Sequence, residues 1–193
     1  MSDLVFQAIT YAAQCHEGQY RKGTEIPYIV HPLGMLRALA RLGAPVHLQA
    51  AAVLHDVVED TDATLEDIAQ RFGQRVAGLV EGATEKDKSL GWIERKQAAV
   101  SHAQASQDVE LIVLKCVDKL DNLNDIRADH ELHGESIWAR FKATHGDQMW
   151  YYGTLTRLFE ERLAGTAYQP LAVQIKAVYE MVFGPLAAPQ QLP

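Results

Sequence analysis

The spacing of apolar residues predicts helices along nearly the whole chain. Near the start, Leu4, Ala8, Tyr11 and Cys15 recur at intervals of three and four residues, as on one face of an amphipathic helix. Comparable runs follow, each bounded by Gly, Pro or turn-forming residues. The expected helices span residues 3–16, 32–42, 46–58, 65–72, 74–84, 92–105, 107–129, 148–163 and 171–182. No segment alternates apolar and polar residues as a strand does, so the predicted class is all-α.

Local signals support some of these helices. Thr64, with Asp67 three residues later, resembles a capping box at the start of a helix. Ser106 is a candidate N-cap for the helix that follows it. The apolar run 111–117 fits a buried strand or a buried helix on periodicity alone. We interpret it as a helix because apolar residues keep a three-residue spacing beyond it without a breaker.

Length and composition indicate an ordinary globular protein. The chain has 193 residues, 48% hydrophobic and 22% charged, which fits one domain over residues 1–183 and a flexible tail over 184–193. The formal charge of −7 argues against binding of a nucleic-acid polymer. We find neither a basic leader nor an apolar run long enough to cross a membrane, and we expect a cytoplasmic protein. Cys15 and Cys116 are isolated and are expected to be buried, reduced thiols.

Residues 54–60 combine apolar character with a histidine and three carboxylates. The preceding run, 48–54, is rich in Ala and Leu and is typical of a buried helix, which carries His55 and Asp56 into the interior. Buried polar groups need a partner or a metal there. Continued as a helix, the segment places Glu59 and Asp60 one turn beyond the first pair. A bound cation would therefore have two more carboxylates beside it.

A metal site of two histidines and two carboxylates is the strongest candidate for chemistry. His31 precedes the helix that Pro32 is expected to start, and Asp118 follows the apolar run 111–117. With His55 and Asp56, these side chains offer nitrogen and oxygen ligands that suit Mn²⁺ or Fe²⁺ better than a closed zinc site. Each residue alone has a structural explanation, such as an N-cap, a hydrogen-bonded core histidine or a surface charge. Their combination after apolar runs favours the metal site.

Nucleotide-binding residues are also suggested by position. Asp118, Asn122 and Asp125 share one stripe of a helix, which fits either a polar face turned to solvent or a nucleotide contact, since the amide of Asn122 suits a ribose or a base edge. Arg21 and Lys22 lie in the loop 18–27, where phosphate recognition or base stacking competes with a simple solvated charge pair. The neighbouring Lys119 and Asp121 are interpreted as surface residues, and 150–152 as packing. Walker-type loops, the His-Glu-x-x-His zinc motif and the Gly-x-Ser-x-Gly elbow are absent.

Several of these segments together resemble a known family. They are residues 21–32 (with Pro27-Tyr-x-x-His-Pro32), 55–61 (His-Asp-x-x-Glu-Asp-Thr), 72–73, 79–84 and 118–123. In order and spacing they are similar to the HD-type hydrolase domain of the RelA/SpoT alarmone enzymes, over about residues 4–128. The resemblance implies an all-helical HD domain that uses Mn²⁺ to remove the 3′-pyrophosphate of guanosine tetra- or pentaphosphate.

The resemblance also assigns roles to individual residues. His31, His55, Asp56 and Asp118 match the metal ligands, and Glu59 and Asp60 match the acidic pair near the attacking water. Arg21 and Asn122 match nucleotide contacts, with Lys22 a weaker match. Residues 129–193 are too few for a synthetase domain, so the chain resembles a stand-alone small alarmone hydrolase of the metazoan SpoT-homologue type.

One departure leaves the substrate open. Where the long enzymes commonly carry Arg-Thr, this chain has Asn124-Asp125. An acidic residue beside a nucleotide leaves an adenosine alarmone or the 2′-phosphate of NADPH as alternative substrates. A metal-binding module that senses alarmone without cleaving it is a further alternative. The presence of both Glu59 and Asp60 disfavours that last alternative.

Overall fold

The computed structural model describes residues 3–85 and 89–187, and it confirms the all-α prediction. Within those ranges, the only pairing of extended backbone is an isolated antiparallel bridge between Tyr20 and Pro27. The chain divides after Thr84 into two compact units. The expectation of a single domain over residues 1–183 stays a prediction. Of the expected tail, residues 188–193 lie outside the described residues.

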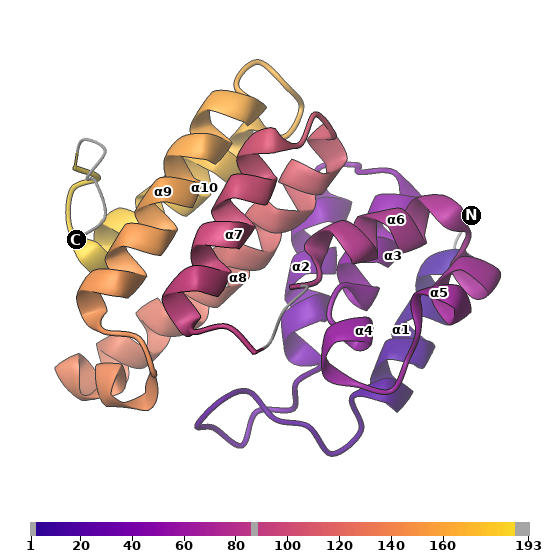
Figure 1. The fold of residues 1–193 in the computed structure, drawn as a ribbon, viewed down its shortest axis with the longest axis horizontal. Coiled ribbons are helices and arrows are strands. Elements are labelled where there is room, and N and C mark those ends of the chain that lie inside the picture. Colours follow the sequence, from indigo (N-terminus) through magenta and orange to yellow (C-terminus); the bar gives the residue numbers. More distant parts are fainter. Residues whose placement is uncertain (1–2, 86–88, 188–193) are drawn as a thin grey trace. The chain divides into compact units, whose positions relative to one another are not determined.

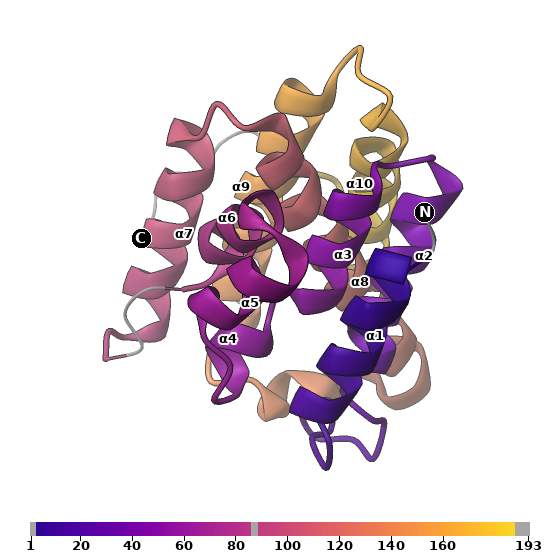
Figure 2. The same cartoon turned by 90° about the vertical axis from the view of Figure 1, so that its right-hand side faces the viewer.

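The first unit is built around a buried helix. Its helices are α1 (Asp3–Cys15), α2 (Val30–Arg41), α3 (Val46–Leu54), α4 (Val57–Asp60), α5 (Leu65–Phe72) and α6 (Gln74–Ala83). Helix α3 packs against α1, α2 and α6 (Figures 1 and 2). All five residues from Ala50 to Leu54 are buried, as expected for a helix that is apolar on every side. The C-terminal end of this helix therefore delivers His55 into the interior.

The predicted helix over residues 46–58 is wrong in one respect, because it breaks at His55 and Asp56. Helix α3 ends at Leu54, and the single turn α4 begins at Val57. The imidazole Nδ1 of His55 lies 2.9 Å from the carbonyl oxygen of Ala52. A continuous helix would use that oxygen for the N–H of Asp56. The side chain of His55 thus takes over a backbone acceptor, and the chain turns at this point.

Two other details of the first unit bear on the site. Helix α2 begins at Val30, two residues earlier than predicted, so His31 lies inside its first turn instead of before it. Pro32 still lies in that first turn, where its missing N–H costs no hydrogen bond. The capping box of Thr64 and Asp67 is confirmed: the Thr64 hydroxyl accepts from the Asp67 N–H, and the Asp67 carboxylate accepts in return.

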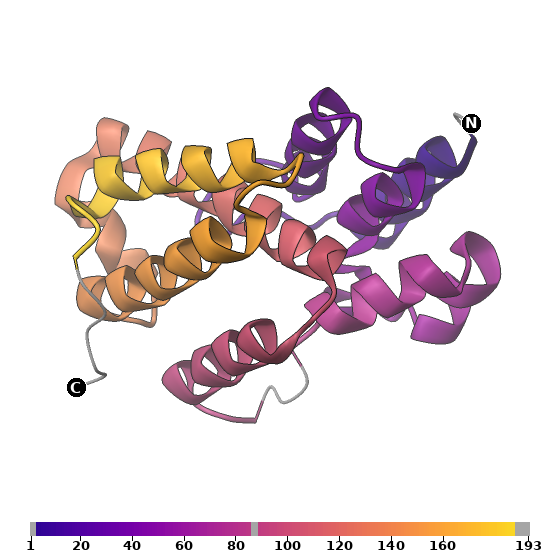
Figure 3. The ribbon, with the colours of Figure 1, turned by 90° about the horizontal axis from the view of Figure 1, so that it is seen from above.

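The second unit is organised around one long helix. Its elements are α7 (Trp92–Ala105), α8 (Val109–His133), the 3₁₀ helix η1 (Gly134–Arg140), α9 (His145–Leu163) and α10 (Gln169–Phe183). Helix α8 packs against α9 and α10, which lie alongside each other in Figure 3. The run Leu111–Leu114 is buried within α8, so its interpretation as a helix is confirmed.

The boundaries in the second unit differ from prediction at several points. Asp108, and not Ser106, caps α8, because its carboxylate accepts the N–H groups of Glu110 and Leu111. Ser106 instead ends α7. Helix α9 begins three residues earlier than predicted, at a capping box formed by Thr144 and Asp147. The 3₁₀ helix η1 was not predicted.

The prediction of buried, reduced thiols is confirmed for one of the two cysteines. Both are free thiols; Cys116 is buried, whereas Cys15 is only half-buried, contrary to expectation. Burial raises the pKa of the Cys116 thiol well above its ordinary value, so this side chain stays protonated.

Among the described residues, no helix combines the length and the apolar character needed to span a membrane.

Candidate active site

Two buried histidines face each other in the first unit. His31 comes from the first turn of α2 and His55 from the end of α3, and they are 2% and 3% exposed. Their Nε2 atoms lie 3.3 Å apart. The Nδ1 atom of His55 faces the carbonyl oxygen of Ala52, which can only accept, so Nδ1 carries the proton. The Nε2 lone pair of His55 is therefore available to a metal, as in many histidine ligands whose tautomer is fixed this way.

Asp56 adds an oxygen ligand to this pair. Its Oδ2 lies 2.8 Å from the Nε2 of His55. The hydroxyl of Tyr28 donates a hydrogen bond to the same carboxylate oxygen. Ligating carboxylates are commonly held by such a second hydrogen bond. The Nε2 of His55 thus lies close both to the Nε2 of His31 and to a carboxylate oxygen of Asp56, and nitrogen and oxygen donors of this kind suit a divalent metal ion.

Tyr28 is a contributor for which sequence analysis gave no role. It lies 28 positions before Asp56 in the chain, in the loop that leads into α2. The guanidinium of Arg21 lies 5.7 Å from the centre of its ring, within the range of a cation–π contact. The structure therefore brings Arg21 next to the residue that donates to Asp56. The neighbouring Lys22 has an exposed side chain.

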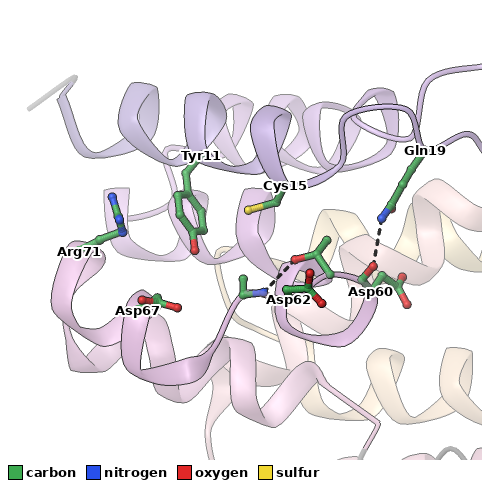
Figure 4. Close-up of a pocket in the computed structure, with 9 residues that line it drawn as sticks. Tyr11, Cys15, Gln19, Asp60, Asp62, Asp67 and Arg71 are labelled. Carbon is green, nitrogen blue, oxygen red and sulfur yellow. Dashed lines mark hydrogen bonds between the residues drawn. The ribbon is translucent and has the colours of Figure 1, made fainter.

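The acidic pair, Glu59 and Asp60, lies one turn beyond His55 and Asp56. Glu59 and Asp60 belong to the single turn α4, in which the N–H of Asp60 donates to the carbonyl oxygen of Asp56 at 2.9 Å. Glu59 is half-buried and Asp60 is exposed. The carbonyl oxygen of Asp60 also accepts a hydrogen bond of 3.0 Å from the side-chain amide of Gln19 (Figure 4). The predicted i, i+4 relation between the two pairs is thus kept, even though the longer helix is broken.

The remaining predicted residues lie in the second unit, on α8. The carboxylate of Asp118 accepts hydrogen bonds on both oxygens, from Asn122 Nδ2 and from Lys119 Nζ, each at 2.6 Å. Asn122 therefore lies one turn along from Asp118, as the helical stripe predicts. Asp125, the third residue of the stripe, has an exposed side chain.

The interpretation of Lys119 as a surface residue is wrong. Its side chain is 19% exposed and is held between Asp118 and the ring of Tyr151, whose centre lies 5.9 Å from the ammonium. Burial alone would lower the pKa of Lys119, but the carboxylate of Asp118, together with Tyr151 and Tyr152, raises the pKa well above its ordinary value. Lys119 is therefore a firmly charged partner of Asp118.

A second cation and a carboxylate complete this cluster. The ammonium of Lys96, from α7, lies 5.3 Å from the centre of the Tyr151 ring and pairs with Glu85. Arg95 reaches the same carboxylate at 2.9 Å. Burial and the charge of Lys119 lower the pKa of Lys96. No spacing in the sequence relates these residues, because they come from separate segments that only the fold brings together.

Comparisons with known proteins agree with this geometry. The HD-domain family matches residues 8–148. A mouse protein named guanosine-3′,5′-bis(diphosphate) 3′-pyrophosphohydrolase MESH1 is 39% identical over 171 residues, covering 82% of this chain and 94% of the mouse protein. Its namesake in Xenopus tropicalis is 44% identical over 128 residues, covering 64% of this chain and 70% of that protein. A Vibrio cholerae protein named guanosine-3′,5′-bis(diphosphate) 3′-pyrophosphohydrolase is 38% identical, and its match covers 18% of that longer protein.

Solved structures give the same result. A structure described as a metazoan ortholog of SpoT that hydrolyses ppGpp has a TM-score of 0.75 and 30% identity, covering 95% of this chain and 98% of its own. The protein lmo0812 from Listeria monocytogenes has a TM-score of 0.67 and 33% identity, covering 78% of this chain and 99% of its own. With its facing histidines, its His-Asp doublet and these matches, the chain belongs to the HD-domain family.

Proposed function

We propose that this protein hydrolyses the 3′-pyrophosphate of guanosine tetra- and pentaphosphate, releasing pyrophosphate and leaving GDP or GTP. The observation that carries the proposal is that His55, with His31 and Asp56 both close to its Nε2, lies one turn before the acidic pair of α4. A cation site beside two further carboxylates suits the attack of water on a phosphate ester. The names of the mouse and Xenopus relatives, and the described activity of the metazoan SpoT ortholog, support the choice of substrate.

The proposed metal is Mn²⁺, with Asp118 as its fourth protein ligand. Two nitrogen and two oxygen donors suit Mn²⁺, and the resemblance to the RelA/SpoT hydrolase domain supports both assignments. When bound, such a cation lowers the pKa of a coordinated water and polarises the phosphate. Within the second unit, Lys119 and Asn122 hold the carboxylate of Asp118 by both oxygens, which restricts its rotation.

We propose that the acidic pair orients the attacking water and removes its proton. Glu59, half-buried in α4, orients the attacking water and accepts its proton. Asp60, the exposed member, passes the proton towards solvent. The hydrogen bond from the Asp60 N–H to the carbonyl oxygen of Asp56 closes the turn that carries both carboxylates, directly after the proposed metal ligands His55 and Asp56.

Recognition of the nucleotide is proposed to involve four residues. Arg21 presents a planar guanidinium beside Tyr28, which suits stacking on a base or pairing with a phosphate. Lys22, exposed in the same loop, adds positive charge for the phosphates. Asn122 offers an amide to the ribose, and the exposed Asp125 offers a carboxylate to hydrogen-bond donors of a base.

One assay tests the proposal against its alternatives. Purified protein with Mn²⁺ is offered guanosine alarmones, adenosine alarmones and NADPH, and the release of pyrophosphate and phosphate is measured. We expect pyrophosphate from the guanosine alarmones, and no release after chelation of the metal. Preferential release of phosphate from NADPH, or turnover of adenosine alarmones alone, would replace the proposed substrate. Tight binding of nucleotide without turnover of any substrate would contradict the enzyme assignment. The predictions of a cytoplasmic location and of no nucleic-acid polymer as partner stay predictions.

A further inference from the structure

A side-chain bridge connects the end of α1 to the acidic turn α4. Gln19, four residues after α1, donates from its Nε2 to the carbonyl oxygen of Asp60 at 3.0 Å. Figure 4 shows this bond at one end of a cavity of about 540 Å³, which is also lined by Tyr11, Cys15 and Asp62. The amide of Gln19 therefore connects α4 to a different part of the first unit, 41 positions away in sequence.

His16 fixes the orientation of this amide. Its Nδ1 lies 2.8 Å from Oε1 of Gln19. The carbonyl oxygen of Asp60 can only accept, so Nε2 of Gln19 must face it and Oε1 must face the imidazole. His16 is 4% exposed, and its ring packs on Tyr28 with the ring centres 4.6 Å apart. A buried ring that cannot turn freely thus holds the amide in the orientation that donates to Asp60.

Tyr28 and Gln19 hold the two ends of residues 56–60, the segment that carries the acidic pair. Tyr28, packed on His16, donates to the carboxylate of Asp56 before α4, and Gln19 donates to the carbonyl of Asp60 at its end. Helix α4 is a single turn of four residues, and so short a helix has little stability of its own. The hydroxyl of Thr61 bonds to Val57 at 2.6 Å, but this closes the turn on itself without attaching it to another element. The placement of α4 therefore depends on the buried side chain of Val57 at its start and on bonds from outside it, including the bond from Gln19 at its end.

We infer that Gln19, oriented by His16, is a positioning residue that sets where Glu59 and Asp60 stand relative to the metal ligands His55 and Asp56. This inference rests on the proposed function, in which the acidic pair handles the attacking water. Displacement of a reacting group by about 1 Å can cost on the order of 100-fold in rate. A single hydrogen bond that fixes a short catalytic turn can therefore affect turnover more than it affects overall stability.

The test uses Gln19→Glu, which preserves size and shape. A carboxylate still accepts from His16 but cannot donate to the carbonyl of Asp60, so the bridge is removed and one negative charge is added. Gln49→Glu is the matched control, because the amide of Gln49 donates to the carbonyl of Ala44 at 2.7 Å in the same unit and is half-buried like Gln19. With the guanosine alarmone and Mn²⁺, we expect kcat of Gln19→Glu to fall by about 10- to 100-fold. KM and the affinity for Mn²⁺ should stay close to those of the unmodified protein, and Gln49→Glu should keep its kcat.

A second measurement does not depend on the substrate. Hydrogen exchange of the backbone amides of residues 57–62 is followed in the metal-free protein, and we expect it to be faster in Gln19→Glu but unchanged in Gln49→Glu. Unchanged exchange in Gln19→Glu, or faster exchange with an unchanged kcat, would overturn the inference. If the unmodified protein cleaves no alarmone, the proposed function fails while the exchange measurement still decides whether Gln19 holds α4. Should Gln19→Glu not fold, Gln19→Met removes the amide without adding charge and is measured in the same way.

Discussion

The two units contain polar clusters of opposite kinds. In the first unit, the Nε2 of His55 lies close both to the Nε2 of His31 and to the carboxylate of Asp56, all three being possible ligand atoms. In the second unit, each carboxylate is paired with an ammonium, Asp118 with Lys119 and Glu85 with Lys96. The first cluster is arranged to hold a cation. The second neutralises its own charges and is arranged to keep its side chains in place.

This difference determines what each cluster contributes. Histidine nitrogens remain available at neutral charge, so they can be buried without counter-ions until a metal arrives. A buried carboxylate without a partner is costly, so Asp118 and Glu85 are accompanied by lysines. Substitutions in the first cluster should therefore affect metal binding and chemistry, whereas substitutions of the lysines in the second should affect stability strongly; Asp118, the proposed fourth ligand, belongs to both tests. The predictions that follow test this division.

The largest effect is expected from removal of a metal ligand in the first unit. His55→Ala deletes the Nε2 donor that lies 3.3 Å from His31 and 2.8 Å from Asp56. We expect loss of Mn²⁺ binding, measured by calorimetry, and hydrolysis reduced to the background of the assay. His133→Ala, at an exposed position at the end of α8, is the control and should retain both. A His55→Ala protein that still binds the metal with unchanged affinity would show that the cluster is not the metal site.

A smaller effect, confined to turnover, is expected from Glu59→Gln. The amide keeps the size of the side chain but cannot accept the proton of the attacking water. Loss of a general base typically costs about 10²- to 10⁴-fold in rate. We expect kcat to fall within that range while Mn²⁺ binding is retained, which separates Glu59 from the ligands. Comparison with Asp60→Asn identifies the base, because the variant with the larger loss marks the group that takes the proton. Equal, minor losses in both variants would contradict the proposed role of the acidic pair.

The second cluster is tested through stability. Lys119→Met removes the ammonium and leaves the carboxylate of Asp118, which is 15% exposed, without its paired cation. Breaking such a buried pair from one side costs on the order of 3 kcal/mol. We expect the urea midpoint of the metal-free protein to fall accordingly. Lys176→Met is the control: Lys176 is 41% exposed and pairs with Glu160, and exposed pairs of this kind contribute little. Equal destabilisation by the two substitutions would show that burial does not distinguish the clusters.

The two clusters also differ in how far the sequence predicts them. The first is contained in short contiguous motifs, so the order of its two histidines and its carboxylate is visible in the sequence. The interruption between α3 and α4 is not visible, because it depends on a bond between His55 and the carbonyl of Ala52 that forms only in the folded chain. Tyr28 and Gln19 were missed for the same reason, since their partners lie 28 and 41 positions away.

Most contacts of the second cluster could not be predicted from the sequence. Only Asp118 and Asn122 share a helical stripe, and Asn122 was correctly placed beside Asp118. Lys119 was assigned to the surface because neighbouring helical residues point in different directions. Its long side chain nevertheless turns back to Asp118 beside Tyr151. Tertiary contacts of flexible charged side chains cannot be deduced from periodicity, which describes only the direction of the Cβ atom.

The smallest effect is expected from the pH dependence of the Glu85 pair. Burial would raise the pKa of Glu85, but the charges of Lys96, Lys119 and Arg95 together outweigh it and hold the pKa below its ordinary value. A carboxyl group whose pKa is lower in the folded state stabilises the protein above its unfolded pKa, and this contribution is lost as the pH falls through the folded pKa. Glu85→Gln lacks this contribution. At neutral pH its unfolding free energy should therefore be lower than that of the unmodified protein by the whole contribution. The difference should shrink in acid below the ordinary glutamate range. Urea denaturation across that range measures it, and a difference that does not change with pH would mean that Glu85 contributes by shape and hydrogen bonding instead of charge.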